Sequence, residues 1–414
     1  MDNRHCRFCG HELRHVFADL GLSPLANEYL TAEDLNQGQM FFPLKVQVCE
    51  KCFLVQAALY QRPEQIFGEY QYFSSFSESW LAHCKAYVGM IVPRLSLGPN
   101  SRVLEIACND GYLLQYFQPF GIPVKGVEPA ENIALVARAK GIDVRCCFFG
   151  ADTAREIAVQ DGHYDLVIDN NVLAHVPDIN NFVEGLSTVL SPEGTITMEF
   201  PHLMRLIQYS QFDTIYHEHF HYLSLMTVQR IFRAHGLEIY DVEELHTHGG
   251  SLRIYAAHQE YGYAQMRPAV AELLAREREF GLEDLQTYAA FADKMRQIKL
   301  DTLRSLTEWK QQGKRIAGFG AAAKGNTFLN YCGIKSDVID FVVDSSPHKQ
   351  GFYLPGSLIP IVGPDVLWER KPDYLLILPW NLTEEIVDAA SCIREWGGQF
   401  VVCIPQIRVF SVDT

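Results

Sequence analysis

The sequence predicts an α/β protein in which two doubly wound sheets follow a small metal-bound N-terminal subdomain. Short apolar runs alternate with amphipathic segments from Ser101 to Ala257, and the alternation restarts at Arg315. This pattern is typical of parallel strands covered by helices. Two C-x-x-C pairs near the N-terminus predict the metal-bound subdomain. We therefore expect three units, over residues 1–65, 66–265 and 266–414.

The composition argues against several classes of partner. The 414 residues carry a formal net charge of -15, which disfavours nucleic acids and anionic membranes because both attract Lys and Arg. No apolar run reaches the roughly 18 residues of a membrane helix, and no apolar signal segment is visible. Eleven cysteines without a leader fit a reducing compartment. We expect a cytoplasmic protein that is monomeric or weakly dimeric.

Four cysteines form the two pairs Cys6/Cys9 and Cys49/Cys52. The spacing lets two thiolates reach one ion from a tight turn, so the pairs together predict a tetrahedral zinc site. Four protein ligands leave no position open for water, and we interpret the zinc as structural. Its bonds would replace the hydrophobic core that so short a segment cannot build. Two disulfides or a redox dithiol are the alternatives.

In the central unit the sequence predicts alternating strands and helices, followed by two adjacent strands. This order is the plan of Rossmann-like class I methyltransferases, in which a late antiparallel pair completes the sheet. The expected strands are 101–107, 124–128, 164–169, 195–200, 237–245 and 251–257, and the expected helices are 112–117, 132–140, 180–190 and 226–235. Residues 268–311 predict two bridging helices.

The loop after the first of these strands, Glu105-Ile-Ala-Cys-Asn-Asp-Gly111, is the candidate cofactor loop. An acid followed by small residues at alternate positions resembles motif I of S-adenosylmethionine (SAM) methyltransferases, although only one of the three usual glycines remains. Small side chains let the backbone approach a ligand. Glu128 could accept both ribose hydroxyls of an adenosine, and Asp169 with the two following asparagines would border the adenine.

Another nucleotide or an ordinary strand–helix turn are the alternatives for this loop. The loop lacks the G-x-G-x-x-G string that a dinucleotide site prefers. The candidate SAM-binding residues are Tyr72, Ser75, Glu105, Ala107, Asn109, Gly111, Tyr112, Leu113, Glu128, Pro129, Asp169, Asn170 and Asn171.

Titratable residues crowd one short segment, Tyr216-His-Glu-His219-Phe-His221. Packing alone rarely requires such a cluster, so we expect general acid–base chemistry there. The string also matches the H-E-x-x-H motif of metalloproteases, which needs a long helix. A buried or solvated cluster without a catalytic role is the other alternative. His175 is a further catalytic candidate, because it follows the strand that borders the adenine.

The third unit carries a candidate phosphate site. Its expected strands are 315–320, 338–344, 374–378 and 400–404, with a helix over 324–332. Lys324 and several small residues lie where the first strand meets the helix, and backbone amides at such a position suit a phosphate. Asp344, Lys349 and the pair Trp380-Asn381 follow later strands, at the sheet edge where ligands bind. We expect a mononucleotide here, and a degenerate domain kept for packing is the alternative.

Over nearly its whole length the chain resembles the SAM-dependent C-methyltransferases that act on nucleotide-linked 4-keto-6-deoxysugars. The resemblance depends on the order of several modest motifs. They are the cysteine pairs, Leu25-Ala-Asn27, the Tyr-Phe-Ser-Ser connector at 72–75, the loop 105–111, Tyr216-His-Glu-His219, His248-Gly-Gly-Ser-Leu-Arg253, residues 318–326 and Lys349-Gln-Gly351. The resemblance implies a structural zinc subdomain, a SAM domain, and a C-terminal domain that holds the nucleotide of a nucleotide-diphosphate sugar.

The resemblance also implies roles for individual residues. His219 would remove the proton at C-3′, and Tyr216 would donate a hydrogen bond to the C-4′ oxygen of the resulting enolate. Glu218 and His175 would orient the substrate or the base. The implied substrate-binding residues are Asn171, His202, His248, Ser251, Arg253, Lys324, Asn326, Asp344, Lys349, Trp380 and Asn381.

Two other functions remain possible at the level of sequence. An O- or N-methyltransferase would act on a small acceptor that is itself a nucleophile, with no need of a ketone. A non-catalytic protein with a SAM-type fold would bind SAM without turnover. The titratable cluster argues against the second, because a binding protein has no need of these residues there.

Overall fold

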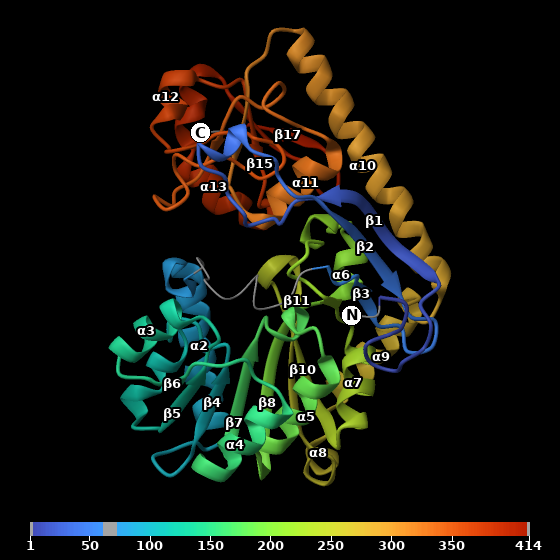
Figure 1. Cartoon of the computed structure of the whole chain (residues 1–414), viewed down its shortest axis with the longest axis vertical. Helices are drawn as coiled ribbons and strands as arrows, with labels where there is room; N and C mark the ends of the chain where they lie inside the picture. Colours follow the sequence, from blue (N-terminus) through green and yellow to red (C-terminus); the bar gives the residue numbers. More distant parts are fainter. Residues whose placement is uncertain (1–2, 61–72, 412–414) are drawn as a thin grey trace.

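The computed structural model describes residues 3–60 and 73–411. They form two lobes, and a long helix with strands beside it runs along one side of the molecule and connects them (Figure 1). The lower lobe in this view holds a seven-stranded sheet and the upper lobe a six-stranded sheet. A four-stranded sheet lies beside the long helix.

The four-stranded sheet combines distant parts of the chain. Its antiparallel order is β1 (His15–Ser23), β2 (Phe42–Val48), β3 (Val55–Ala57) and β9 (His221–Tyr222). Alternate residues of β2 are buried, as in a strand with one face on a core. In the last pair His221 lies opposite Gln56. The N-terminal unit therefore reaches the segment that follows His219.

The seven-stranded sheet has the order β10-β11-β8-β7-β4-β5-β6. Neighbouring strands are parallel except β11, which is antiparallel to both β8 and β10. This is the Rossmann-like arrangement that the sequence predicts. The strands are β4 (Val103–Ile106), β5 (Val124–Val127), β6 (Asp143–Arg145), β7 (Tyr164–Asn170), β8 (Leu190–Pro201), β10 (Leu237–Leu245) and β11 (Ser251–His258).

Apolar cores lie on both faces of this sheet. In β4, Val103 belongs to one core, whereas Leu104 and Ile106 belong to the other. Local residues start the covering helices: the side chain of Asp178 accepts an N–H at the beginning of α5, and that of Ser224 does so in α7. The helices are α2 (Glu78–Arg94), α3 (Glu131–Ala139), α4 (Ala151–Asp161), α5 (Ile179–Val189), α6 (Leu203–Gln208), α7 (Leu225–Ala234) and α8 (Gln259–Gln265).

Two predicted elements differ in the structure. Residues 112–117, expected as a helix, form 3-10 turns at Leu114–Tyr116 and Gln118–Phe120. Pro119 lacks the N–H that a continuing helix needs, and Gly121 ends the second turn with a φ of 65°. The strand expected over 338–344 shrinks to two residues, because residues 338 and 339 both donate to the carbonyl of Lys335 in a turn.

The six-stranded sheet has the order β14-β13-β12-β15-β16-β17 and is parallel except for β17. The strand order reverses at β12, which is the place where open sheets bind ligands. The elements are β12 (Ile316–Phe319), β13 (Val342–Val343), β14 (Ile361–Val362), β15 (Tyr374–Ile377), β16 (Gln399–Val402), β17 (Arg408–Phe410), α11 (Ala323–Cys332), α12 (Val366–Arg370) and α13 (Thr383–Ala389).

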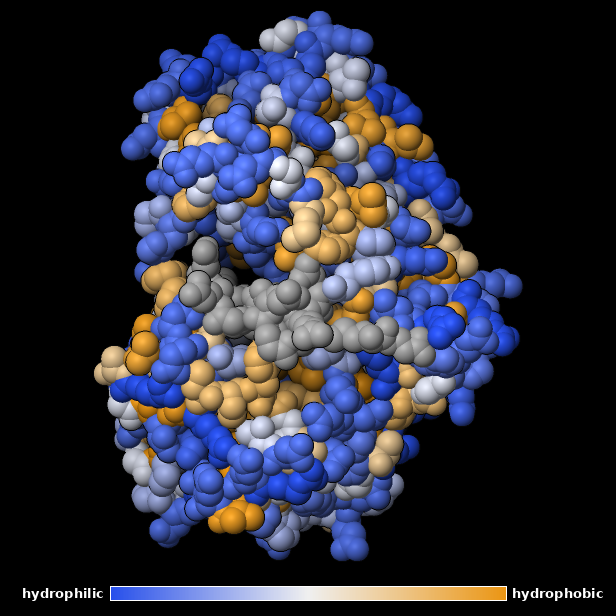
Figure 2. Space-filling model, viewed as in Figure 1, coloured by the Kyte–Doolittle hydropathy of each residue, from blue (hydrophilic) through white to orange (hydrophobic). Residues whose placement is uncertain are grey.

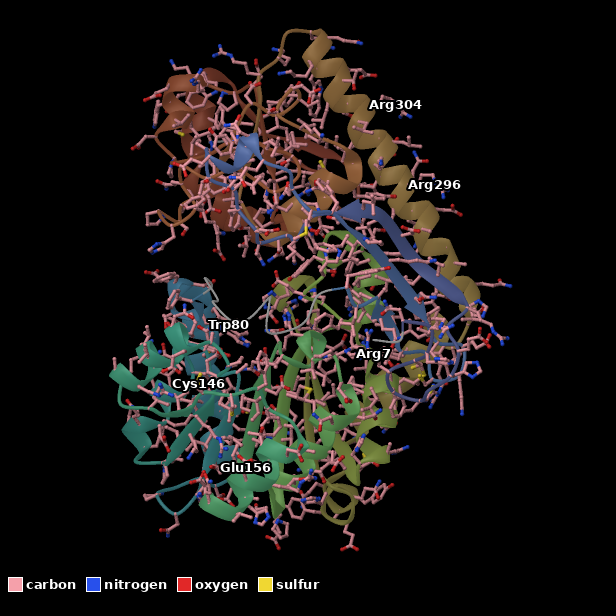
Figure 3. The ribbon with its side chains drawn as sticks, in the orientation of Figure 1. Arg7, Trp80, Cys146, Glu156, Arg296 and Arg304 are labelled. Carbon is pink, nitrogen blue, oxygen red and sulfur yellow. The ribbon has the colours of Figure 1, made fainter. Side chains whose placement is uncertain are left out.

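Two helices connect the lobes, α9 (Pro268–Phe280) and α10 (Leu285–Gln311). On the inner side of α10, Phe291 stacks on Phe17 of β1 with ring centroids 4.6 Å apart. On its outer side Arg296 and Arg304 (labelled in Figure 3) form exposed ion pairs within the helix. The long helix thus ties the four-stranded sheet to both lobes.

The surface in Figure 2 is mostly hydrophilic and is notched at its left edge between the lobes. Among residues 3–60 and 73–411, no helix is both long and apolar enough to cross a membrane.

Candidate active site

The four cysteines of the N-terminal unit converge on one point. The sulfurs of Cys6 and Cys52 are 3.5 Å apart, those of Cys9 and Cys49 are 3.6 Å apart, and all four lie within 4.8 Å of one another. Thiolates about 2.3 Å from a tetrahedral zinc ion would have nearly this separation. All four are free cysteines, so the disulfide alternative is wrong. In the part of the chain that the structure describes, this is the one cluster arranged to hold a metal.

The candidate cofactor loop makes its turn with only one glycine. Ala107, Asn109 and Gly111 all have positive φ values, of 52°, 48° and 76°. Asparagine tolerates this region because its side chain bonds locally, and Asn109 Oδ1 accepts the N–H groups of Ser74 and Asp110, both at 2.9 Å. At Gly111 an added Cβ would lie 2.3 Å from a side-chain carbon. The loop therefore keeps its left-handed turn with alanine and asparagine in two of the glycine places, and Gly111 is required by the packing of Ile142 against it.

Buried carboxylates surround this loop. Glu128 accepts the N–H groups of Asn109 and Ala130, both at 3.0 Å, and burial raises the pKa of Glu128 to about 6. Burial also raises the pKa of Asp169 to about 7 and that of Glu105 well above its ordinary value. One oxygen of Asp169 is buried without a hydrogen-bond partner. Such an orphaned acceptor fits a polar ligand, as the hydroxyl and amino groups of SAM would be.

The remaining predicted cofactor residues border the same loop or follow β7, with Tyr72 outside the described residues. Those that the structure places are Ser75, Tyr112, Leu113, Pro129, Asn170 and Asn171. Ser75 Oγ accepts from Lys140 Nζ at 2.9 Å. Asn171 has a φ of 60° and its Nδ2 lies 3.4 Å from Nε2 of His248. Asn171 thus connects the cofactor side of the sheet with the loop before β11.

His219 has both ring nitrogens engaged. Nδ1 is 2.7 Å from the backbone carbonyl of Thr214, and Nε2 is 2.8 Å from the hydroxyl of Tyr216. A carbonyl only accepts, so Nδ1 carries the proton and Nε2 of the neutral ring accepts from the hydroxyl. Burial and the neighbouring His175 lower the pKa of His219 well below its ordinary value. Nε2 is therefore unprotonated at neutral pH, as a general base requires.

His175 and Glu218 flank His219. The ring of His175 meets that of His219 edge-on with centroids 4.7 Å apart, and burial lowers the pKa of His175 to about 4. The backbone N–H of Phe220 donates to the carbonyl just before His175, at 2.7 Å. Glu218 accepts a 2.6 Å hydrogen bond from Asn27, and burial raises the pKa of Glu218 to about 7. His219 therefore lies among groups whose burial favours their neutral forms.

The other two histidines of the segment have separate partners. His217 Nε2 lies 3.3 Å from the carbonyl of Pro43, whereas His221 Nε2 accepts from Arg7 Nε at 3.1 Å. Residues 215–220 contain no helix and lie between a 3-10 turn and β9. The metalloprotease alternative is therefore wrong, because its motif places both histidines on one face of a helix.

Aromatic and charged residues from α2 and β11 line the neighbouring wall. Trp80, labelled in Figure 3, stacks on His83 at 5.1 Å and lies 5.7 Å from the ring of His248. His83 contacts both oxygens of Glu199 at 3.0 Å, and Arg253 Nε donates to Glu199 at 2.9 Å. Although burial would raise the pKa of Glu199, His83 and Arg253 hold it below its ordinary value. The ionised carboxylate of Glu199, paired with His83 and Arg253, therefore holds these side chains in place.

In the upper lobe, Asp344 holds the loop after β12. Its oxygens accept the N–H groups of Ala321 at 2.8 Å and of Ser346 at 2.9 Å. Lys349 Nζ lies 3.6 Å from Asp344 and donates to the carbonyl of Ala321 at 2.8 Å. Tyr29 of the N-terminal unit donates to the same carbonyl at 2.7 Å. This loop is therefore prearranged by residues from two units.

Lys324 faces the lower lobe. Its Nζ is 3.2 Å from Asn381 Oδ1 and 5.3 Å from the ring centroid of Trp380. Trp380 Nε1 donates to Asp213 at 2.8 Å, across the boundary between the lobes. Burial lowers the pKa of Lys324, and its charge adds to the effects of burial and of His175 that lower the pKa of His219. The upper lobe therefore brings a cation within electrostatic range of His219.

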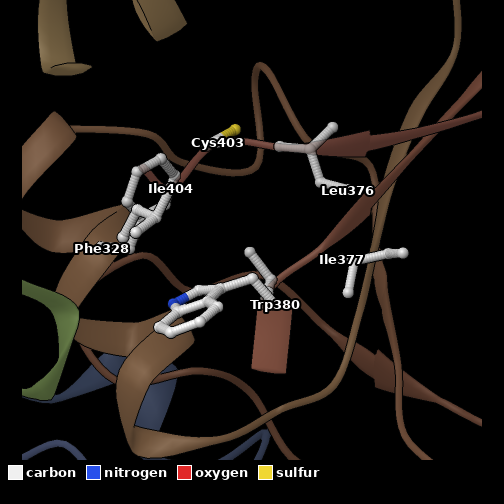
Figure 4. Close-up of a pocket in the computed structure, with 7 residues that line it drawn as sticks. Phe328, Leu376, Ile377, Trp380, Cys403 and Ile404 are labelled. Carbon is white, nitrogen blue, oxygen red and sulfur yellow. The ribbon is translucent and has the colours of Figure 1, made fainter. Parts of the chain in front are cut away.

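A small apolar pocket adjoins Trp380 at the carboxyl ends of β15 and β16 (Figure 4). Its lining residues are Phe328, Leu376, Ile377, Leu378, Trp380, Cys403 and Ile404. Its volume of about 10 Å³ has room for about one water molecule, so it is a gap in the core of the upper lobe.

Four predicted substrate residues are instead engaged within the fold. They are His202, Ser251, Arg253 and Asn326, each at most 5% exposed. His202 Nε2 lies 2.7 Å from Glu277, and Asn326 Nδ2 donates to the carbonyl of Ala26 at 2.6 Å. Ser251 donates to a backbone carbonyl and Arg253 pairs with Glu199. In this structure these four side chains are held by partners within the fold, and their contact with a substrate stays a prediction.

Sequence reasoning missed several residues that the structure brings to the site. They are Arg7, Asn27, Trp80, His83 and Asp213. A signal existed for Asn27, which belongs to the motif Leu25-Ala-Asn27. For the others no sequence motif indicated a role for the residue itself, and only tertiary contacts reveal them.

Known proteins match this chain along its whole length. Residues 6–67 match a zinc binding domain, residues 80–242 a methyltransferase domain, and residues 246–405 a C-methyltransferase C-terminal domain. C-methyltransferase NovU of Streptomyces niveus is 38% identical over 409 residues, which cover 99% of this chain and 97% of NovU. A ubiquinone biosynthesis O-methyltransferase of Bartonella bacilliformis is 25% identical over 135 residues, 31% of this chain and 53% of that protein.

Among solved structures, a protein of Pyrococcus horikoshii OT3 gives a TM-score of 0.38 at 16% identity, covering 48% of this chain and 100% of that chain.

The fold, the cofactor loop and the family matches define a SAM-dependent methyltransferase with a structural zinc site. SAM, when bound, supplies an electrophilic methyl group, and the loop 105–111, Glu128 and Asp169 would hold it. More particularly, the chain belongs to the C-methyltransferase family that includes NovU.

Proposed function

We propose that the protein methylates C-3′ of a nucleotide-linked 4-keto-6-deoxysugar. A C-methyltransferase must make a carbon nucleophilic, and a carbon beside a ketone becomes so when a base removes its proton. The observation that carries the proposal is His219, whose proton is held on Nδ1 by the carbonyl of Thr214 while Nε2 stays basic. A base of this kind contributes roughly 10²–10⁴-fold to a rate.

In the proposed reaction Nε2 of His219 takes the proton from C-3′. The electron pair of the C–H bond enters the C-3′–C-4′ bond, and the C-4′ oxygen becomes an enolate. C-3′ then bonds to the methyl carbon, both electrons of the old S–C bond remain on sulfur, and the C-4′ carbonyl forms again. His219 returns its extra proton to solvent.

Tyr216 and Lys324 favour the enolate in this scheme. Before substrate binds, the hydroxyl of Tyr216 donates to His219 Nε2. A sugar that displaced this bond would leave the hydroxyl able to donate to the C-4′ oxygen as negative charge develops. The positive charge of Lys324 would also favour the negatively charged enolate. Lys324 is near enough for this, because its charge contributes to the lowered pKa of His219.

The nucleotide would lie against the upper lobe. Lys324 and Lys349 would face its diphosphate, and Trp380, whose ring lies beside Lys324, would border it. Asn171 and His248, which contact each other at the end of the lower sheet, would border the sugar.

The test is incubation with SAM and a panel of 4-keto-6-deoxy nucleotide sugars, followed by mass spectrometry for one added methyl on carbon. A parallel incubation in D2O with S-adenosylhomocysteine follows hydrogen exchange at C-3′. His219→Asn should abolish both signals. His217→Asn is the matched control, because it alters the same motif at a residue bonded to Pro43, and it should keep both.

Two outcomes would contradict the proposal. Exchange at the wild-type rate in His219→Asn would assign the base to another residue. Methylation of an acceptor without a ketone, with no product from any keto sugar, would exclude the enolate route altogether.

A further inference from the structure

Arg7 is one of the side chains through which the zinc subdomain contacts the segment around His219. Arg7 stands between the first two zinc ligands in the chain and donates three hydrogen bonds. Nη2 donates to the carbonyl of Phe220 at 2.6 Å, Nη1 to that of Ala57 at 2.9 Å, and Nε to His221 Nε2 at 3.1 Å. Figure 3 labels Arg7 where the N-terminal unit meets the lower lobe.

The partners of Arg7 adjoin His219 directly. Phe220 is the next residue in the chain, and its own N–H bonds to the carbonyl before His175. His221 and Ala57 belong to the paired strands β9 and β3. Arg7 therefore joins both strands of this pair to the backbone on which the base is mounted.

A residue of the methyltransferase domain also holds the backbone of Arg7. Asn180 Nδ2, near the start of α5, donates to the carbonyls of Arg7 and Phe8, both at 3.0 Å. The N–H of Arg7 donates to Gln56 Oε1 at 3.1 Å. A guanidinium has five N–H donors and stays protonated in proteins, so the side chain can make all three bonds at once.

We propose that Arg7 is a positioning residue for methyl transfer, and that the closed cysteine turn 6–9 acts on His219 through it. The inference rests on the proposed role of His219 as the base. The turn formed by residues 6–9 fixes the position of the Arg7 backbone. The hydrogen bonds of the Arg7 side chain then fix the position of the segment 219–221. A displacement of about 1 Å in a catalytic group costs about 10²-fold in rate, so a small movement of this connection has a large effect.

The test compares Arg7→Met, which keeps length and loses every donor, with Arg7→Lys, which keeps a cation. Arg14→Met is the matched control, because Arg14 lies in the same unit and pairs with Glu12 at the surface. For each variant we would measure zinc content, SAM affinity, kcat and KM. Hydrogen exchange at the amides of residues 219–222 is measured separately.

We expect Arg7→Met to keep its zinc and to bind SAM within about twofold of wild type. Its kcat should fall about 100-fold with little change in KM, and exchange at residues 219–222 should accelerate. Arg7→Lys should recover part of the lost rate, and Arg14→Met should match wild type in every measurement.

An unchanged kcat in Arg7→Met would overturn the proposal. A parallel loss of zinc, SAM affinity and kcat would instead mean a general defect of folding. If Arg7→Met fails to fold, wild type stripped of zinc by a chelator decides the matter. Exchange should then rise at residues 219–222 together with residues 6–9, and continued protection of 219–222 would refute the connection. Because exchange needs no substrate, this result stands even if the proposed sugar reaction fails.

Discussion

Replacing Glu218 by glutamine should stabilise the protein, and increasingly so as the pH rises. Glu218 is 5% exposed and accepts a 2.6 Å hydrogen bond from Asn27. Burial raises its pKa from 4.5 to about 7, because the folded protein resists a charge that the unfolded chain solvates readily. Glutamine keeps an oxygen for Asn27 but carries no charge.

The magnitude follows from the two pKa values of Glu218. The interval between 4.5 and about 7, at about 1.4 kcal/mol per pH unit, corresponds to about 3 kcal/mol. Between these values the folded protein binds more protons than the unfolded chain, so wild-type stability is lost as the pH rises through this window and stays lower above it. The advantage of Glu218→Gln should therefore grow by about 3 kcal/mol between pH 4 and pH 8.

Urea unfolding of both proteins, followed by circular dichroism at pH 5, 6.5 and 8, measures this growth. Glu272→Gln, on the exposed side of α9, is the control and should show no advantage that changes with pH. The same stability difference at pH 5 and pH 8 would refute the reasoning, because it would mean that Glu218 ionises in the fold as easily as in water.

Three further outcomes are expected. Gly249→Ala should destabilise the protein by about 1–3 kcal/mol and lower its thermal midpoint, because at a φ of +87° the new Cβ would lie 2.4 Å from Trp380. Lys324→Met should raise the pKa of His248, measured by NMR titration, because burial and the charge of Lys324 together lower it to about 4. Cys49→Ser should lose the zinc, measured by metal analysis, and lower the thermal midpoint, because metal binding and folding of the N-terminal unit are coupled.

Each of these has a control and a result that would contradict it. Gly236→Ala, with positive φ but no atom within 4 Å of the added Cβ, should cost less than Gly249→Ala, and an equal cost would deny the clash. Lys294→Met removes an exposed cation and should leave the pKa of His248 unchanged. If the pKa of His248 rose equally in both variants, the effect of Lys324 would not be local. Cys392→Ser should keep the zinc, and full metal content in Cys49→Ser would remove Cys49 from the ligand set.

Much of the fold could be predicted because its elements depend on local patterns. The strand β10 was expected over residues 237–245 and spans Leu237–Leu245, since its apolar run is long and bounded by Gly236. Short elements were less predictable. The two residues of β13 owe their strand geometry to the flanking β12 and β14, and a turn that begins at Lys335 takes the positions before them.

The site shows a different limit. His219 was expected from its neighbours in the chain, yet the contacts that define its surroundings come from far away. Asn27, which bonds to Glu218, is 191 residues distant in sequence. His202 was assigned to the substrate through the family resemblance, but in the structure its Nε2 contacts Glu277, which lies 75 residues later on a linking helix. A sequence pattern gives the chemistry of a side chain, whereas its partner depends on how separate units pack.

The two halves of the reaction therefore have different structural requirements. The cofactor loop is complete within the seven-stranded sheet, since its turn and its acids lie between Val103 and Asn171. The segment of the proposed base is not: it pairs with β3 of the zinc unit, bonds to Arg7, and lies near a lysine of the upper lobe. A methyltransferase sheet alone would keep the loop 105–111 and its acids but would lack the contacts that place Nε2 of His219. If His219 is the base, the C-methyltransferase reaction therefore requires all three units, whereas the proposed SAM site requires only the sheet.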